Sequence, residues 1–162
     1  MLCGAKPNQA NSPMSERPDF MKIALDLARK AGEAGEVPVA ALLVHDGEII
    51  ASAPNRMREL NDPTAHAEML ALREALGKRS GARLDDCDLY VTLEPCTMCA
   101  GAIAHARVRR LYYAARDPKA GAVESGVRFF DQPTCHHRPE VISGIREDEA
   151  AEMLRRFFAE KR

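Results

Sequence analysis

Apolar and polar positions alternate along the chain in a way that predicts both helices and strands. From about residue 19 to 32 apolar residues recur at helical spacing, and Asp19 stands where an N-terminal cap is expected. The apolar stripe of this helix is expected to be Phe20, Ile23, Ala24, Leu27 and Ala28. The apolar run "VPVAALLV" at 37–44 and the segment 48–53 flank Asp46 and Gly47, a strong signal for a tight turn. The pattern therefore predicts a helix followed by two antiparallel strands.

The same pattern predicts three further helices and three further strands. A helix is predicted from Pro63, which suits a first helical position because its missing N–H costs nothing there. A strand at 89–93, a helix at 95–106 and a strand at 108–115 follow; after a loop-rich stretch come "PEVISGI" and an amphipathic helix from Glu147. We predict an α/β fold with three layers, in which helices cover both faces of a mixed five-stranded sheet.

Composition places the chain among single-domain globular proteins. At 162 residues with 46% hydrophobic and 29% charged residues, one core is expected, at 17–162, behind a polar and disordered tail at 1–16. That opening lacks the apolar core of a signal peptide, and no apolar run approaches a membrane span, so we expect a cytoplasmic protein without membrane contact. A net charge of −1 gives no overall attraction to nucleic acid, so RNA binding requires a local patch.

Cysteine spacing gives the first candidate chemistry. Five cysteines, an odd number without an export signal, favour thiols or metal ligands over disulfides. Cys96 and Cys99 stand three apart at a predicted helix start, so both sulfurs can reach one ion. Alone, a C-x-x-C pair also fits redox and structural zinc sites.

His66 and Glu68 supply the partner motif "HAE". His66 is a third ligand of a type that zinc accepts, and three protein ligands leave a place for water, as in catalytic sites. No fourth cysteine or histidine is obviously placed to close the site. Glu68 faces another side of the helix, so we expect it to take a proton from the water rather than to bind the ion. A purely structural interpretation is also open: His66 could be a packed ring, and Glu68 a carboxylate that stabilises the helix N-terminus. It explains each residue singly, but it does not explain their combination with Cys96 and Cys99.

"HAE" at 66–68 and "PCTMC" at 95–99 resemble the zinc-dependent cytidine and deoxycytidylate deaminase-like superfamily. Longer segments, among them "NRMRELNDPTAHAEMLALREA" and "DLYVTLEPCTMCAGAIAHARVRRLYYAARDPKAGAVESG", look like the bacterial tRNA-specific adenosine deaminase family. The resemblance runs from about Phe20 to the last helix. It implies a cytidine deaminase-like fold and a homodimer with one Zn²⁺ per chain, which hydrolyses adenosine to inosine at the wobble position of a tRNA anticodon.

The resemblance also implies residue roles. Glu68 would shuttle the proton, and the zinc ligands would be His66, Cys96 and Cys99. Asn55 would hydrogen-bond the flipped nucleoside, in a pocket walled by Val37, Pro38, Ala67 and Glu94. The segment "ARDPKAG" matches a loop that touches the anticodon, and the residues expected to contact RNA are Asp117, Lys119, Arg116, His136 and His137. Of Phe157 and Phe158, we expect one in the core and one near the RNA.

Two other functions share parts of this signature. A deaminase of a free base such as guanine or cytosine has the same zinc motif, but the segments after Cys99 and the absence of an extra acidic closing segment disfavour it. A non-catalytic, zinc-stabilised RNA-binding subunit would have lost its proton shuttle, and Glu68 is present.

Overall fold

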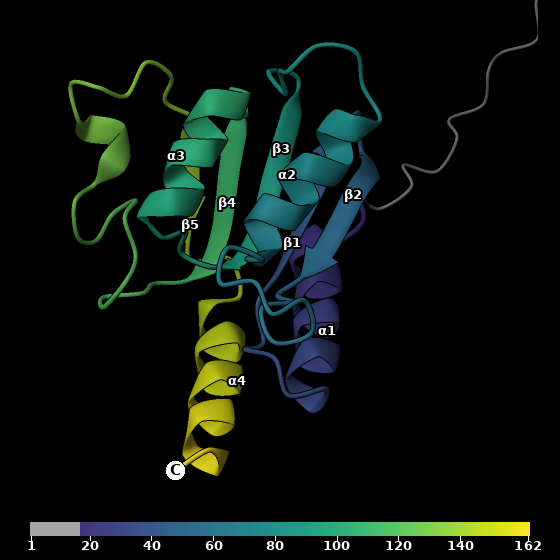
Figure 1. Cartoon of the computed structure of the whole chain (residues 1–162), viewed down its shortest axis with the longest axis vertical. Helices are drawn as coiled ribbons and strands as arrows, with labels where there is room; N and C mark the ends of the chain where they lie inside the picture. The colour runs from purple at the N-terminus through teal and green to yellow at the C-terminus, as the bar shows by residue number, and fades with distance from the viewer. Residues whose placement is uncertain (1–16) are drawn as a thin grey trace, which may run out of the picture.

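A five-stranded sheet forms the middle layer of the structure, a computed structural model that describes residues 17–162 (Figure 1). The strands are β1 (Ala40–His45), β2 (Glu48–Pro54), β3 (Cys87–Leu93), β4 (Arg110–Ala115) and β5 (Glu140–Ser143). Their order is β2-β1-β3-β4-β5; β1 is antiparallel to β2 and β3, whereas β3, β4 and β5 run parallel. The predicted mixed sheet is confirmed. The tail predicted at 1–16 lies outside the described residues.

Helices cover both faces of the sheet, so the predicted three layers are confirmed. One core joins α2 (Ala67–Gly77) and α3 (Thr97–Ala106) to one face, and a second joins α1 (Phe20–Glu33) and α4 (Glu147–Glu160) to the other (Figure 1). The short 3-10 helix η1 (Phe129–Asp131) lies in the loop-rich stretch. No helix within 17–162 is both long and apolar enough to cross a membrane.

Burial on both faces explains the continuous apolar run of β1. Successive strand residues point to opposite faces, so Leu42 belongs to the core under α1 whereas Leu43 belongs to the core under α2. β1 begins at Ala40 rather than at 37, because the N–H of Val39 bonds to the carbonyl of Val37 in a turn and Pro38 has no N–H to give.

The first helix is capped as predicted, but it buries only part of the expected stripe, namely Phe20, Ala24 and Ala28. The Asp19 side chain accepts a hydrogen bond from the backbone N–H of Lys22 at 3.0 Å. Met21 and Leu25 are buried, whereas Ile23, expected in the core, is 39% exposed. The expected and the observed sets of buried residues both have helical spacing. Which set is buried depends on how the side chains of the helix pack against the sheet.

The prediction that α2 starts at Pro63 is wrong. The carboxylate of Asp62 accepts hydrogen bonds from the backbone N–H and the hydroxyl of Thr64, at 2.8 and 2.7 Å. Such a local turn competes with helix, so α2 begins only at Ala67, and His66 is its N-cap with an extended backbone. His66 therefore lies immediately before the first turn of the helix, not within it.

Candidate active site and metal centre

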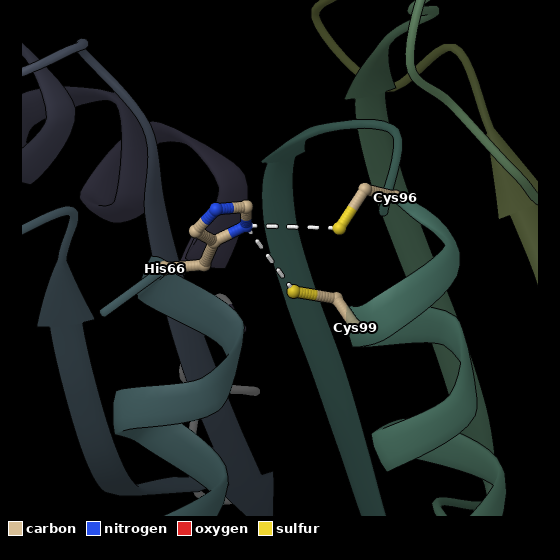
Figure 2. A group of neighbouring side chains, drawn as sticks. All are labelled: His66, Cys96 and Cys99. Atoms are coloured by element: carbon tan, nitrogen blue, oxygen red, sulfur yellow. Dashed lines mark hydrogen bonds between the residues drawn. The ribbon is translucent and has the colours of Figure 1, made fainter. Parts of the chain in front are cut away.

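The starts of α2 and α3 meet at one end of the sheet. α2 follows β2 and α3 follows β3, and these strands point the same way because each is antiparallel to β1. His66 and Cys96 are the N-cap residues of these helices, and neither side chain caps its own helix. Both side chains are thus free to face the space between the two helix ends (Figure 2).

The spacing of the three predicted ligands fits one zinc ion. Nδ1 of His66 lies 3.7 Å from Sγ of Cys96 and 3.5 Å from Sγ of Cys99 (Figure 2). Around tetrahedral zinc, with Zn–N of ~2.0–2.1 Å and Zn–S of ~2.3 Å, neighbouring nitrogen and sulfur ligands lie about 3.6 Å apart. A nitrogen and two sulfurs at these distances can hold the ion with little rearrangement.

Hydrogen bonds and helix ends favour negative charge on the sulfurs. Hydrogen bonding from Cys99 lowers the pKa of Cys96 to about 4, whereas the same interaction and burial raise the pKa of Cys99. The bond to Cys96 raises the pKa of His66. The positive ends of two helices add to this preference. A bound cation would displace the remaining thiol proton.

Glu68 lies beside the ligand group. Its side chain is buried, and Oε2 lies 2.9 Å from Sγ of Cys99, which donates to it. Burial raises the pKa of this carboxyl group. Glu68 therefore has access to the space in front of the ligands, which is where a proton shuttle has to be.

Asn55 holds the start of α2. Its Oδ1 accepts the backbone N–H of Ala67 at 2.9 Å, and its own backbone N–H bonds to the carbonyl of Val39 at 2.9 Å. The loop after β2 thus caps α2 in place of His66. Because the carbonyl oxygen is in use, the amide NH₂ is the group left to donate to a ligand.

A cavity of about 1110 Å³ opens in front of these groups. Of the residues predicted to wall the nucleoside pocket, Val37 and Glu94 line it together with Asn55. Pro38 lines a different cavity, next to α1 and α4, and Ala67 is fully buried behind the surface.

The predicted RNA contacts divide into two groups. Arg116, Asp117 and Lys119 line the cavity. His136 and His137 do not: Nε2 of His137 lies 2.7 Å from the carbonyl of Val108, near the start of β4 and far from its cavity end.

The end of α4 forms a part of the cavity for which the sequence suggested only one residue, either Phe157 or Phe158. α4 extends beyond the sheet (Figure 1). The cavity is lined there by its last turns and by the two residues that follow it: Leu154, Arg155, Phe158, Ala159, Lys161 and Arg162. Phe158 is 49% exposed there, whereas Phe157 lines the neighbouring cavity next to α1. An aromatic residue among exposed basic ones was the available signal.

Glu94 connects the loop after β4 to the candidate metal site. Its buried Oε1 accepts hydrogen bonds from Ser125 at 3.1 Å and Tyr113 at 3.4 Å. Oε2 has no hydrogen-bond partner within 17–162 and faces Gly121, which forms a β-bridge with Cys96. The loop that presents Asp117 is thereby connected to Cys96, a candidate metal ligand.

Comparison with known proteins places the chain among deaminases. The profile of the cytidine and deoxycytidylate deaminase zinc-binding region matches residues 14–115. The tRNA-specific adenosine deaminase of Agrobacterium fabrum is 64% identical over 149 residues, which are 92% of this chain and 98% of that protein.

Two solved structures are also similar. One comes from studies of A-to-I editing by tRNA:A34 deaminases at the wobble position of transfer RNA; it has a TM-score of 0.81 and 64% identity, and the match covers 83% of this chain and 98% of that chain. The guanine deaminase of Nitrosomonas europaea has a TM-score of 0.74 and 29% identity, with 86% and 82% covered.

Proposed function

Because the chain belongs to the cytidine and deoxycytidylate deaminase family, and within it to the tRNA-specific adenosine deaminases, we propose that it hydrolyses adenosine to inosine at the wobble position of a tRNA anticodon. The observation that supports this most directly is the cavity itself. Its lining includes the buried carboxylate of Glu68, two of the three candidate metal ligands, and basic side chains from two separate segments, among them Arg116, Lys119 and Arg155. A negatively charged polynucleotide suits that lining better than a free base does.

The ligand triad and Glu68 divide the chemistry between them. His66, Cys96 and Cys99 would bind one Zn²⁺ per chain, and when bound the ion supplies a Lewis acid that lowers the pKa of water toward ~7. The Glu68 carboxylate accepts a proton from the attacking water and delivers it to the ring nitrogen. It then takes the proton of the hydroxyl group newly formed on the ring carbon and transfers it to the departing amino group. Water and adenosine thus give inosine and ammonia. The NH₂ of Asn55 orients the flipped nucleoside.

The strongest rival is a deaminase of free guanine or cytosine, since a guanine deaminase shares the fold. The cavity has a volume of about 1110 Å³, of which a free base would fill only a small part. It is also lined by a loop and a helix end that carry basic residues, for which a free base has no use. A non-catalytic RNA-binding subunit would have no use for a buried Glu68 within 2.9 Å of a ligand sulfur.

The test uses an anticodon stem-loop RNA with adenosine at the wobble position, and inosine is read as A-to-G changes on sequencing. Glu68→Gln keeps the shape of the side chain but cannot accept the proton, so we expect turnover to fall by at least about 10²–10⁴-fold while zinc stays bound. The matched control is Glu74→Gln, in the same helix but away from the cavity, where Glu74 bonds to Ser52 and Lys78.

The outcomes separate the candidates. Ammonia release from free guanine or cytosine without inosine in the RNA would refute the proposed substrate. RNA binding without turnover in the wild-type protein would favour the non-catalytic subunit. Undiminished turnover of Glu68→Gln would remove Glu68 from the mechanism but leave the substrate assignment standing.

We further propose that the protein acts as a cytoplasmic homodimer in which both subunits contribute to the anticodon-loop site. The family resemblance supports the dimer, and a tRNA substrate favours the cytoplasm. Sedimentation equilibrium of the purified chain, with and without the stem-loop, measures the dimer directly; a monomer in both conditions would contradict it.

A further inference from the structure

A second group of metal-ligating side chains lies at the end of β3 opposite to Cys96. His45 closes β1 and Cys87 opens β3, and the two residues are direct partners in the antiparallel ladder. Partners of this kind share a face, with Cβ atoms about 4.5–5.5 Å apart. Asp86 precedes Cys87, and one ligand atom from each of the three residues lies within 4.8 Å of the others. Strand pairing rather than a loop brings the group together.

The His45 ring is oriented as in a metal ligand. Nε2 lies 3.3 Å from a carboxylate oxygen of Asp46, and the tautomer with its proton on Nε2 would leave the Nδ1 lone pair for an ion. Metal-binding histidines typically have such a carboxylate partner on the other ring nitrogen. Nδ1 is buried without a hydrogen-bond partner in the described part of the chain, and Oδ2 of Asp86 is 3.6 Å away. In that tautomer, Nδ1 of His45 and the Asp86 carboxylate both offer lone pairs to the same space.

The guanidinium group of Arg79 is the positive charge that contacts Asp86 and Cys87 in this structure. Its guanidinium donates to Sγ of Cys87 at 2.8 Å and to Oδ2 of Asp86 at 2.7 Å. Arg79 follows the end of α2 and its side chain is partly exposed, so it can turn into solvent. Burial raises the pKa of Cys87 to about 11, and the thiol donates to Oδ1 of Asp86. A metal ion would take the place of both the guanidinium and the thiol proton.

We propose that His45, Asp86 and Cys87 form a second metal site, suited to Zn²⁺, from which Arg79 is displaced. A sulfur, an imidazole nitrogen and a carboxylate oxygen together match the ligand preferences of zinc. On binding, the sulfur–proton bond breaks, the proton passes to solvent and a sulfur–metal bond forms. The site lies roughly 20 Å along β3 from the active-site ligands and shares no atom with them.

Metal content of the full-length chain tests the proposal. After equilibrium dialysis against Zn²⁺, we expect about two ions per chain in the wild type and about one in Asp86→Asn or Cys87→Ser. The matched control is Asp85→Asn, an identical change at the exposed neighbouring residue, which should keep both ions. Co²⁺ serves as a spectroscopic probe, because loss of the second site in Cys87→Ser removes one sulfur–cobalt absorption contribution.

The variant Arg79→Gln distinguishes a metal site from a purely structural ion-pair network, because only a metal site would bind its ion more tightly after the change. Removing the competing guanidinium should tighten the second equivalent of Co²⁺ by at least about tenfold, because charge-assisted hydrogen bonds no longer oppose it. A wild type that binds a single ion, or an Asp86→Asn variant that still binds two, would overturn the proposal. Neither result affects the active-site assignment, because inosine formation needs only the first ion.

Discussion

At Gly121 the lack of a side chain lets two parts of the active site touch. A Cβ built there would lie 1.7 Å from Oε2 of Glu94 and 2.5 Å from the backbone oxygen of Asp117. Gly121→Ala must therefore move the loop away from Cys96. We expect a loss of about 1–3 kcal/mol in the free energy of unfolding together with weaker zinc binding. Chemical denaturation and metal titration measure the two effects.

Gly101→Ala is the control for this prediction. Gly101 lies within α3, and its added Cβ would meet only the ring of Phe129 at 3.9 Å, an ordinary contact. Alanine favours a helix interior over glycine by about 0.5–1 kcal/mol, so this variant should be as stable as the wild type or more stable. Equal losses in both variants would contradict the role of Gly121.

At this scale, residue type, the spacing of Cys96 and Cys99 and the family resemblance selected three candidate metal ligands. The three groups His66, Cys96 and Cys99 do come together. The cap that Asn55 provides and the contact of Gly121 with Glu94 were not predicted, because each joins segments that are distant in sequence. No local pattern records such a contact.

At the scale of elements, α4 places the exposed ring of Phe158 in the cavity lining. Phe158→Ala should raise KM for the anticodon stem-loop about 5- to 100-fold, because stacking of a base on an aromatic ring contributes ~1–3 kcal/mol. Stability should change little, since the ring is half exposed. Initial-rate kinetics with the stem-loop give KM and kcat separately.

Phe157→Ala is the neighbouring control. Phe157 is partly buried in the cavity next to α1, near Gly32, so its loss should lower the melting temperature more than it changes KM. The reverse pattern would place the RNA contact on Phe157 instead.

Element type was predictable where periodicity was clear, and boundaries were not. The strands and helices occur in the predicted order, but α2 starts four residues after Pro63 because Asp62 and Thr64 form their own turn. Local hydrogen bonds of short polar side chains decided that boundary. The extension of α4 beyond the sheet depends on tertiary packing, which the amphipathic pattern does not reveal.

At the scale of the whole molecule, Asp19 joins the first helix to the last. Besides capping α1, it accepts hydrogen bonds from the guanidinium of Arg146, the N-cap of α4, 127 residues away. Asp19→Ala should lower the free energy of unfolding near neutral pH by about 1 kcal/mol through the lost cap. The ion pair adds no more than about 0.5 kcal/mol, because Asp19 is 48% exposed and solvent screens it.

The pH dependence gives an independent check. The bond from Arg146 lowers the pKa of Asp19, so its stabilising effect is complete above the ordinary aspartate pKa and is lost as the pH falls through the lowered value. The difference between Asp19→Ala and wild type should therefore shrink below about pH 4. Asp19→Asn keeps a capping side chain and should lose less at neutral pH; a pH-independent difference would contradict this origin.

The position of Lys161 and Arg162 in the cavity lining bears on how the protein is prepared. An affinity tag fused after Arg162 would emerge where the RNA is proposed to enter, and a polyhistidine tag would also bring foreign metal ligands close to His66. Such a fusion would then depress activity without any defect in the enzyme. Arg17, the first described residue, lines a separate cavity with Asp88 and Arg110 at the far ends of β3 and β4, away from the proposed RNA site.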